Sequence, residues 1–341
     1  MATKKAAKVN QIMEKRILAP SITMYRLYVP DIAKKVKAGQ FVVVRGDDMA
    51  ERIPLTVADY DVKKGTITII FQEVGTSTQK LAKFEAGQAL LDVVGPLGKA
   101  SHVEKFGTVI CVGGGVGVAP VLPIAKALLE AGNEVISIIG ARTQSMLILE
   151  EEMKKASTTL HVTTDDGSYM EKGFVTTKLK GMIDAGRKLD FVLAIGPIPM
   201  MRAVAEVTRP FGIKTVVSLN PIMVDGTGMC GGCRVLVNKK TLFACVDGPE
   251  FHGDQVDFDE LIARQRAYRA QEVQSLEIGD AAAEEDHSCK LEPEIAKHEA
   301  LAKKLTPQDF ENMTAVFVAH TVTKMANRRS SFDEVNQGFS E

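Results

Sequence analysis

The sequence predicts a multidomain chain: a small antiparallel β-barrel, a doubly wound α/β domain with a parallel sheet, a short cysteine-rich segment and a helical tail. Three observations support this prediction. The length of 341 residues is more than twice that of a typical domain of roughly 150 residues. Short strands separated by turn residues fill the first part of the chain, and strands alternate with helices from residue 107 onward. We therefore expect domains at 1–104, 105–220, 221–256 and 257–341.

The first region has the pattern of closely spaced strands. Candidate strands cover residues 16–18, 24–29, 41–44, 66–71 and 90–94, and one further strand is expected without a clear place. Turn residues such as Ala38-Gly39, Lys64-Gly65 and Gly95-Pro-Leu-Gly98 separate them. Short strands linked by tight turns are typical of a small antiparallel barrel.

The second region alternates strands with helices. Strands are expected at 108–112, 135–139, 160–163, 191–194 and 214–218, and helices at 118–131, 147–155, 175–184 and 199–208. Repeated strand–helix units predict a parallel sheet with helices on both faces. After the cysteine-rich segment, we expect a helix over 258–275, an exposed linker over 279–294 and a helix over 295–326.

Composition excludes several classes of function. Lys and Arg total 42 against 43 Asp and Glu, so no net field attracts nucleic acid or an anionic membrane. The N-terminus carries no apolar signal region, and we expect a cytoplasmic protein. Residues 107–125 are uncharged over 19 positions, but their five glycines and two prolines favour a strand, a turn and a helix start over a membrane span.

A glycine-rich turn joins the first strand of the α/β region to its helix. Gly113, Gly114, Gly115 and Gly117 follow the strand directly. Glycines let the backbone approach a pyrophosphate, and the helix N-terminus offers free N–H groups. The turn is a candidate dinucleotide site, although its spacing is not Gly-x-Gly-x-x-Gly, and a turn that needs glycine only for packing is the alternative.

Three later strand ends add candidate ligand contacts, because ligands of open α/β sheets bind beyond the carboxyl ends of the strands. Arg142 could hold a phosphate, Asp165 or Asp166 could accept hydrogen bonds from ribose hydroxyls, and Gly196 begins another turn. A carboxylate beside the ribose would repel a 2′-phosphate, which favours NAD(H) over NADP(H). Asp165 and Asp166 could also simply fill the turn before Gly167.

The barrel region holds a weaker pattern for a second phosphate-bearing cofactor. An arginine and hydroxyl groups occur in Arg52-Ile-Pro-Leu-Thr56 and in Gly75-Thr-Ser-Thr78, the latter near a helix start. Taken alone, a surface arginine among polar loops explains this pattern better than a cofactor site does.

The cysteine-rich segment gives the strongest chemical pattern. Cys230 and Cys233 are separated by two glycines, and Cys245 follows after eleven intervening residues. In the plant-type [2Fe–2S] spacing, four residues separate a first cysteine from the next, and here Asp225 occupies that first place before Cys230. One carboxylate and three thiolates would then bind the cluster.

Two alternatives to this ligand set remain open. A structural zinc could use the three cysteines with Asp225 or His252, although Cys245 has no cysteine partner nearby. Asp225 could instead be a turn residue, with an outside ligand such as Cys289 in its place. Cys111 is expected to be a buried strand residue.

These motifs, in this order, resemble the ferredoxin reductase-like electron-transfer subunits, which include the FAD/[2Fe–2S] subunit of dihydroorotate dehydrogenase. The resemblance spans roughly residues 9–256 and rests on 52–56, 95–98, 113–120, Gly196-Pro197 with Met200, and the cysteine block. Asp225 and the stretches 164–167 and 246–251 resemble more closely the small subunit of the electron-bifurcating NADH-dependent ferredoxin:NADP oxidoreductase, also described as sulfide dehydrogenase.

The resemblance implies an electron-transfer flavoprotein subunit that connects NAD(H), FAD and a [2Fe–2S] cluster with a larger flavin/iron–sulfur partner subunit. It implies FAD contacts at Arg52, Pro54, Leu55, Thr56, Gly75, Thr76 and Ser77, NAD(H) contacts at Gly113, Gly114, Gly115, Gly117, Arg142, Asp165, Asp166 and Gly196, and cluster ligands at Asp225, Cys230, Cys233 and Cys245. No catalytic acid or base is expected, because the cofactors carry the chemistry. His102, His161 and His320 are therefore expected to be structural or exposed.

Two rival functions remain. One is the electron-transfer subunit of dihydroorotate dehydrogenase itself, and the other is a zinc-stabilised, nucleotide-sensing regulatory subunit without turnover. The tail after residue 256 is outside the resemblance, and we expect it to be an interaction element.

Overall fold

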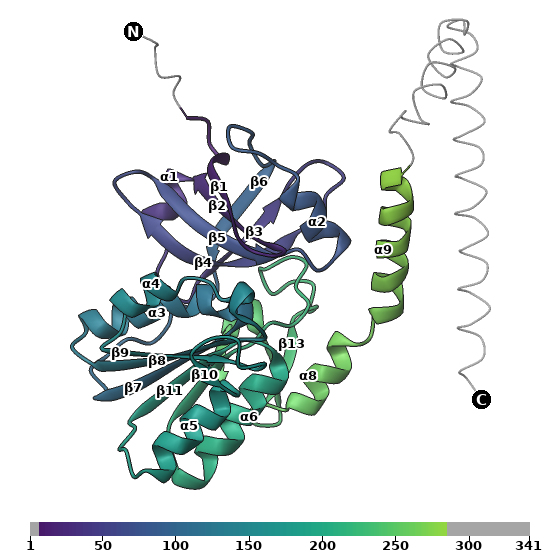
Figure 1. Ribbon diagram of the computed structural model, residues 1–341. Helices are drawn as coiled ribbons and strands as arrows, with labels where there is room; N and C mark the ends of the chain where they lie inside the picture. Colours follow the sequence, from purple (N-terminus) through teal and green to yellow (C-terminus); the bar gives the residue numbers. More distant parts are fainter. Residues whose placement is uncertain (1–6, 285–341) are drawn as a thin grey trace, which may run out of the picture. The chain divides into compact units, whose positions relative to one another are not determined.

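The computed structural model describes residues 7–284 (Figure 1). The chain divides into a first unit, Met1–Gly279, and a second, Asp280–Glu341. Only residues 280–284 of the second unit, at the end of a helix, are among the described residues. The architecture below is therefore that of the first unit.

The first sheet is a six-stranded antiparallel barrel, as predicted. Its strands run in the order β1-β2-β5-β4-β3-β6. They are β1 (Gln11–Ala19), β2 (Ile22–Tyr28), β3 (Phe41–Arg45), β4 (Ile53–Asp61), β5 (Thr66–Gln72) and β6 (Asp92–Leu97). An isolated bridge between Gln11 and Ala89 joins β1 to the segment that leads into β6, which brings the two edges of the sheet together.

β4 is the strand that the sequence pattern left unplaced. Its first half pairs with β3, where Pro54 lies opposite Val43, and its second half pairs with β5 after a register shift between Val57 and Asp59. A proline inside an apolar run normally argues against a central strand. Here β4 changes partners partway along its length, so the proline lies in a barrel corner.

Tyr25 links the barrel core to the short helix α2 (Thr76–Ala82). The ring is fully buried against Phe71, with centroids 5.3 Å apart. Its hydroxyl lies 2.7 Å from the carbonyl oxygen of Leu81 and 2.8 Å from that of Phe84. The end of α2 is thereby anchored to the barrel. The other short helix of this region, α1 (Pro30–Ala33), connects β2 to β3.

The second sheet has seven strands in the order β10-β9-β8-β7-β11-β12-β15. All its pairs are parallel except β12 with β15. The strands are β7 (Thr108–Gly114), β8 (Glu134–Ala141), β9 (Thr159–Thr164), β10 (Glu171–Lys172), β11 (Phe191–Ile195), β12 (Thr215–Ser218) and β15 (Glu250–His252). The five predicted parallel strands are confirmed, and β10 and β15 extend the sheet at its two edges.

Helices cover both faces of this sheet, as predicted. They are α3 (Val118–Glu130), α4 (Glu150–Lys155), α5 (Val175–Asp184) and α6 (Ile198–Thr208). Alternate residues of β7 pack on opposite faces, with Cys111 in the cluster that includes α3 and α4 and Ile110 in the cluster that includes α5 and α6. Cys111 is fully buried, which confirms its predicted place in a strand.

Helix α3 also packs against the barrel, so it forms the layer between the two sheets (Figure 1). Ala58 of β4 and Ile70 of β5 belong to the same buried cluster as the apolar residues of α3. At the edge of this contact, Lys126 Nζ donates to Asp59 Oδ1 at 3.0 Å. The barrel is therefore held against one face of the parallel sheet through α3.

Two helix predictions need correction. The helix expected over 147–155 begins only at Glu150. It is preceded by the 3₁₀ turn η2 (Gln144–Met146) and by Leu147, whose backbone is extended. The helix expected over 258–275 is two helices, α8 (Phe258–Gln265) and α9 (Arg269–Glu284). Helix α9 thus enters the stretch predicted to be a linker, because Ala281, Ala282 and Ala283 favour helix strongly. The helix expected over 295–326 lies outside the described residues.

Within residues 7–284, none of the helices is long and apolar enough to cross a membrane. The uncharged stretch 107–125 forms β7, the 3₁₀ turn η1 (Gly115–Gly117) and the start of α3, as predicted.

A partly buried carboxyl group, that of Glu250, joins β15 to the barrel side of the molecule. Glu250 accepts a hydrogen bond from the Ser101 hydroxyl, and a Cβ at Gly39 would lie 2.8 Å from the Glu250 carboxylate. Burial raises the pKa of Glu250, and the Ser101 hydrogen bond opposes this shift.

This raised pKa predicts a pH-dependent stability. The folded state favours the protonated carboxyl, so this contribution is present at low pH and is lost as the pH rises through the folded-state pKa. Glu250→Gln keeps an acceptor for Ser101 but does not titrate. We therefore expect the Tm of Glu250→Gln to rise relative to that of the unaltered protein between about pH 5 and about pH 8. Parallel Tm curves would contradict this assignment, and Glu130→Gln, at an exposed position, is the control.

Candidate functional site

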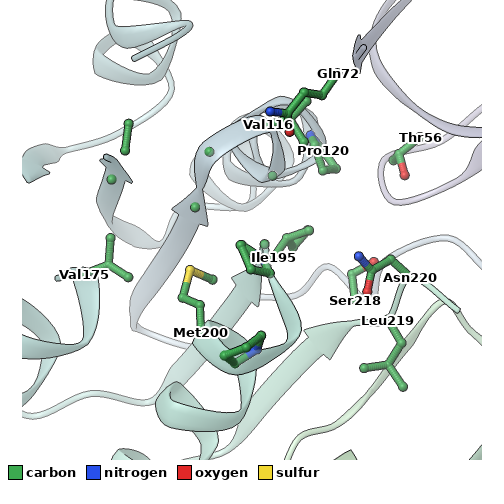
Figure 2. Close-up of a pocket in the computed structure, with 18 of the residues that line it drawn as sticks. Thr56, Gln72, Val116, Pro120, Val175, Ile195, Met200, Ser218, Leu219 and Asn220 are labelled. Atoms are coloured by element: carbon green, nitrogen blue, oxygen red, sulfur yellow. The ribbon is translucent and has the colours of Figure 1, made fainter. Parts of the chain in front are cut away.

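One cleft of about 1080 Å³ brings together residues from the barrel and from the carboxyl ends of the parallel strands (Figure 2). It lies at the point where β7 has β8 on one side and β11 on the other, which is where ligands bind in sheets of this kind. Nine predicted contact residues line it: Pro54, Leu55, Thr56, Gly114, Gly115, Gly117, Arg142, Asp165 and Gly196.

The glycine-rich turn serves both packing and access. A Cβ at Gly113 would lie 3.0 Å from the Val118 Cα, and one at Gly117 would lie 2.8 Å from the Gly196 Cα, so both positions need glycine for close packing. Gly115 has a φ of +56°, and no atom lies within 4 Å of where its Cβ would be. Helix α3 follows without a side-chain cap. The turn can therefore admit a phosphate group toward free N–H groups.

The two aspartates after β9 have different environments. Asp165 lines the cleft. Asp166 accepts a hydrogen bond from the Ser168 N–H at 2.9 Å, and hydrogen bonds from Ser168 lower the pKa of its carboxyl. Gly167 follows with a φ of +78°. Asp166 therefore has the geometry of a turn residue, and Asp165 is the better placed of the two to meet a ribose.

The hydroxyl groups at the start of α2 lie outside the cleft lining, next to Val74, which belongs to it. Gly75 caps α2, and no atom lies within 4 Å of where its Cβ would be. Ser77 donates to the Glu51 carboxylate, and the Thr76 hydroxyl lies 3.0 Å from that of Ser275 in α9. Arg52 is exposed directly before β4. The open space above Gly75 and these hydroxyl groups are compatible with a diphosphate.

The cysteine segment forms a hairpin and one turn of helix. The hairpin consists of β13 (Arg234–Val237) and β14 (Lys240–Phe243), and α7 (Ala244–Asp247) follows. Cys233 and Cys245 are both 2% exposed, and their sulfur atoms lie 3.1 Å apart. Burial and the adjacent Cys233 raise the pKa of Cys245 to about 12. The fold therefore brings two of the three thiols into contact.

The other two predicted ligands lie in the preceding loop. Cys230 is exposed, and backbone N–H groups of Gly232 and Asp225 lower the pKa of its thiol. The Asp225 carboxylate accepts hydrogen bonds from the Thr227 hydroxyl and, at 3.1 Å, from the Thr227 N–H. Over residues 7–284, no three His, Cys, Asp or Glu side chains converge into a metal site.

The donor chemistry of this loop nevertheless fits an iron–sulfur cluster. Three thiols and one carboxylate lie in one short segment, and N–H groups point at the Cys230 sulfur. Gly226, Gly228 and Gly231 have positive φ, which gives the loop its tight turns. His252, the zinc alternative, lies in β15 opposite Val216 and is exposed. Cys289 lies outside the described residues.

The cysteine loop also contacts the barrel. A Cβ at Gly226 would lie 3.0 Å from Leu97 Cδ1 and 3.2 Å from Val43 Cγ2. These two residues belong to β6 and β3, and β3 pairs with the first half of β4, which carries the candidate FAD contacts. The iron–sulfur loop and the candidate FAD strand therefore belong to one packed region.

Sequence reasoning missed several residues that line the cleft. Ser218 ends β12, and Leu219 and Asn220 follow it; all three line the cleft, as does Thr56 of the barrel (Figure 2). The carboxyl-end rule, applied to the last parallel strand, could have found them. Met200 of α6 also lines the cleft, and it was noted only as part of a motif. Of the histidines considered from the sequence, His102 and His161 are not among the lining residues, and His320 lies outside the described residues.

The close approach at Gly117 gives a stability prediction. Gly117→Ala forces a Cβ into the backbone of residues 195–196, so we expect the free energy of unfolding to fall by about 2 kcal/mol or more. Gly181→Ala, in the interior of α5 with no atom within 4 Å, is the matched control and should gain about 0.5–1 kcal/mol. Urea denaturation measures both. A neutral Gly117→Ala would show that the two turns do not pack as described.

Comparisons with known families agree with this arrangement. Residues 111–206 match the oxidoreductase NAD-binding domain. Residues 220–257 match the iron–sulfur cluster binding domain of dihydroorotate dehydrogenase B. The two matches cover the glycine-rich turn and the cysteine loop.

Relatives and solved structures extend the match along the chain. A Thermotoga maritima homologue of the dihydroorotate dehydrogenase B (NAD(+)) electron transfer subunit is 48% identical over 269 residues, 79% of this chain and 95% of the relative. The Bacillus caldolyticus electron transfer subunit is 36% identical over 64% of this chain and 86% of its own length. A structure of the NADH-dependent reduced ferredoxin–NADP oxidoreductase, determined for its flavin-based electron bifurcation, is 45% identical. The two structures superpose with a TM-score of 0.76, and the alignment covers 80% of this chain and 98% of the other.

These likenesses place both matched domains in one family, and they extend over nearly the whole length of the Thermotoga maritima relative. The chain therefore belongs to the family of dihydroorotate dehydrogenase B electron transfer subunits and their homologues, as an oxidoreductase subunit with an NAD-binding domain and an iron–sulfur domain.

Proposed function

We propose that this chain is the electron-transfer subunit of an NADH-dependent ferredoxin:NADP oxidoreductase. In this proposal it moves electrons between NAD(H), FAD and a [2Fe–2S] cluster, to or from a larger flavin/iron–sulfur partner subunit. The observation that carries the proposal is a cleft lined by both the glycine-rich turn and β4, with the cysteine loop packed on the neighbouring barrel strands β3 and β6. The 45% identical structure of that type of enzyme supports it over the other family functions.

The nucleotide end of the cleft suits NAD(H). Gly114, Gly115 and Gly117 line this end of the cleft, the open position at Gly115 gives the pyrophosphate access to the N-terminus of α3, and Arg142 offers a cation at the carboxyl end of β8. Asp165 presents a carboxylate where the ribose of the adenosine half would lie, and it disfavours a 2′-phosphate by charge repulsion. Gly113, Asp166 and Gly196 shape the turns that hold these groups.

The barrel end suits FAD. Pro54, Leu55 and Thr56 of β4 present an apolar edge and one hydroxyl to the cleft. Arg52, Gly75, Thr76 and Ser77 offer a cation, an open backbone and two hydroxyls for the diphosphate. Bound FAD and a bound [2Fe–2S] cluster supply the redox chemistry, because a flavin exchanges a hydride or single electrons and the cluster exchanges single electrons.

The cluster loop presents an apolar rim to solvent. Val224, Met229 and Val246 are 55%, 88% and 40% exposed around the exposed Cys230. Val246 lies against Gly228, because a Cβ added to Gly228 would contact it. Val224 and the Cys230 sulfur both lie near Gly232, because a Cβ added there would contact both. An exposed apolar patch at a redox centre suits a protein partner. We place the larger subunit here.

Domain roles follow from this assignment. We propose residues 1–104 as the FAD domain, 105–220 as the NAD domain, 221–256 as the cluster segment and 257–341 as a region available to a partner.

Anaerobic spectroscopy tests the proposal as a whole. The purified chain should show flavin absorbance with an iron–sulfur shoulder, contain two irons for each FAD in accord with a [2Fe–2S] centre, and have its flavin reduced faster by NADH than by NADPH. A colourless zinc protein without FAD would instead support the nucleotide-sensing alternative. Electron delivery to dihydroorotate dehydrogenase but not to a ferredoxin:NADP oxidoreductase partner would support the other family function.

Asp225 has a separate test. If its carboxylate binds the cluster, Asp225→Ala should lose about half or more of the cluster iron while FAD content is unchanged, and Asp225→Cys should restore iron with an altered EPR spectrum. Asp254→Ala, an exposed aspartate in another turn, serves as the control. Unchanged iron and an unchanged EPR spectrum in Asp225→Ala would contradict the ligand assignment. Asp225 would then be only a turn residue that accepts hydrogen bonds from Thr227.

A further inference from the structure

We propose that Met200 is the positioning residue that sets how deeply the nicotinamide ring enters the crevice between β7 and β11. This inference rests on the proposed function, because it assumes that the cleft takes NAD(H). Met200 lines that cleft, and Figure 2 shows its thioether rising from α6 with Thr56 of β4 on the opposite side.

The thioether lies on the seam between two turns. A Cβ at Gly196 would lie 2.8 Å from Met200 Cε and 3.0 Å from Met200 Sδ, and a Cβ at Gly114 would overlap the sulfur. The same added Cβ of Gly196 would be 3.2 Å from Gly114 Cα, so the two turns are in contact beneath the sulfur. The missing side chains at 114 and 196 therefore create the space that Met200 occupies.

The position of Met200 in its helix fixes this placement. It lies in the first turn of α6, where its N–H donates to the Pro197 carbonyl at 2.9 Å. The next residue, Met201, is fully buried on the other side of the helix, in the core with Leu179 and Val204. Met200 is partly buried against the edge of the same core and also lines the cleft, whereas Met201 lies wholly within the core.

The chemistry of a thioether suits the end of a ring pocket. Methionine is unbranched and polarizable, and its sulfur makes favourable contacts with aromatic rings. A ring that enters the crevice meets this sulfur before it can reach the backbone of Gly114 and Gly196. Met200 would thereby limit the depth of the ring and hold its reacting carbon at one distance from a flavin on the β4 side.

A purely structural role for Met200 makes a different prediction, and ADP-ribose separates the two. ADP-ribose contains the pyrophosphate and both riboses of NAD⁺ but no nicotinamide. A residue that positions the ring affects NAD⁺ alone, whereas a residue that supports the turns affects both ligands.

The test uses the full-length, FAD-loaded protein and three variants. By calorimetry, Met200→Ala should weaken NAD⁺ binding about threefold to tenfold and leave ADP-ribose within about twofold. In rapid mixing, the limiting rate of flavin reduction at saturating NADH should fall about tenfold to 100-fold, because a displaced ring loses its alignment. Met200→Leu, which keeps the side-chain volume, should recover most of both losses, and Met201→Leu should change neither.

Two results would overturn the inference: equal weakening of ADP-ribose and NAD⁺, or a Met200→Ala protein with unchanged NAD⁺ binding and reduction rate. If the unaltered protein bound neither ligand, or its FAD were not reduced by NADH, the proposed function itself would fail and this inference with it. Retained ADP-ribose binding in Met200→Ala also shows that the variant is folded.

Discussion

The site depends on the close approach of the two turns that follow β7 and β11. Gly117 has no room for a Cβ against Gly196, and Gly114 lies directly beside Gly196. Because these strands are neighbours and parallel, their carboxyl ends open on the same edge, and helices leave that edge on opposite faces of the sheet. The crevice between the helices is therefore a consequence of the strand order. The glycines let the two turns approach each other closely, and the Met200 side chain lies at the bottom of the crevice.

The barrel contributes to the cleft because α3 holds it in place. Helix α3 packs on β7 with one side and on β4 with another, so the strand that carries Pro54, Leu55 and Thr56 faces the glycine-rich turn. The contact between Ser101 and Glu250 adds a second link, from the barrel side to the last strand of the sheet. The Glu250 carboxyl is partly removed from solvent and pairs with no cation within residues 7–284, so it is costly to ionise and this link is sensitive to pH.

The cysteine loop shows how local chemistry and tertiary contacts combine. Its glycines allow tight turns, and the hairpin that follows returns Cys245 to Cys233. Packing of Gly226 on β3 and β6 then sets the loop against the barrel. Asp165 and Asp166 also differ in their contacts. The Asp166 carboxylate accepts a hydrogen bond from Ser168, whereas Asp165 lines the cleft. Adjacent residues of one type can thus have different environments.

The sequence alone determined the alternation of strands and helices, the order of the two sheets and the glycine-rich turn, because periodicity and turn residues are local properties. It did not place β4, since the effect of Pro54 depends on a strand that changes partners in a barrel corner. Nor did it distinguish Met200 from Met201, or reveal Ser218 and Asn220 in the cleft. Those assignments depend on which elements become neighbours, and only the packing of the barrel, α3 and the parallel sheet decides that.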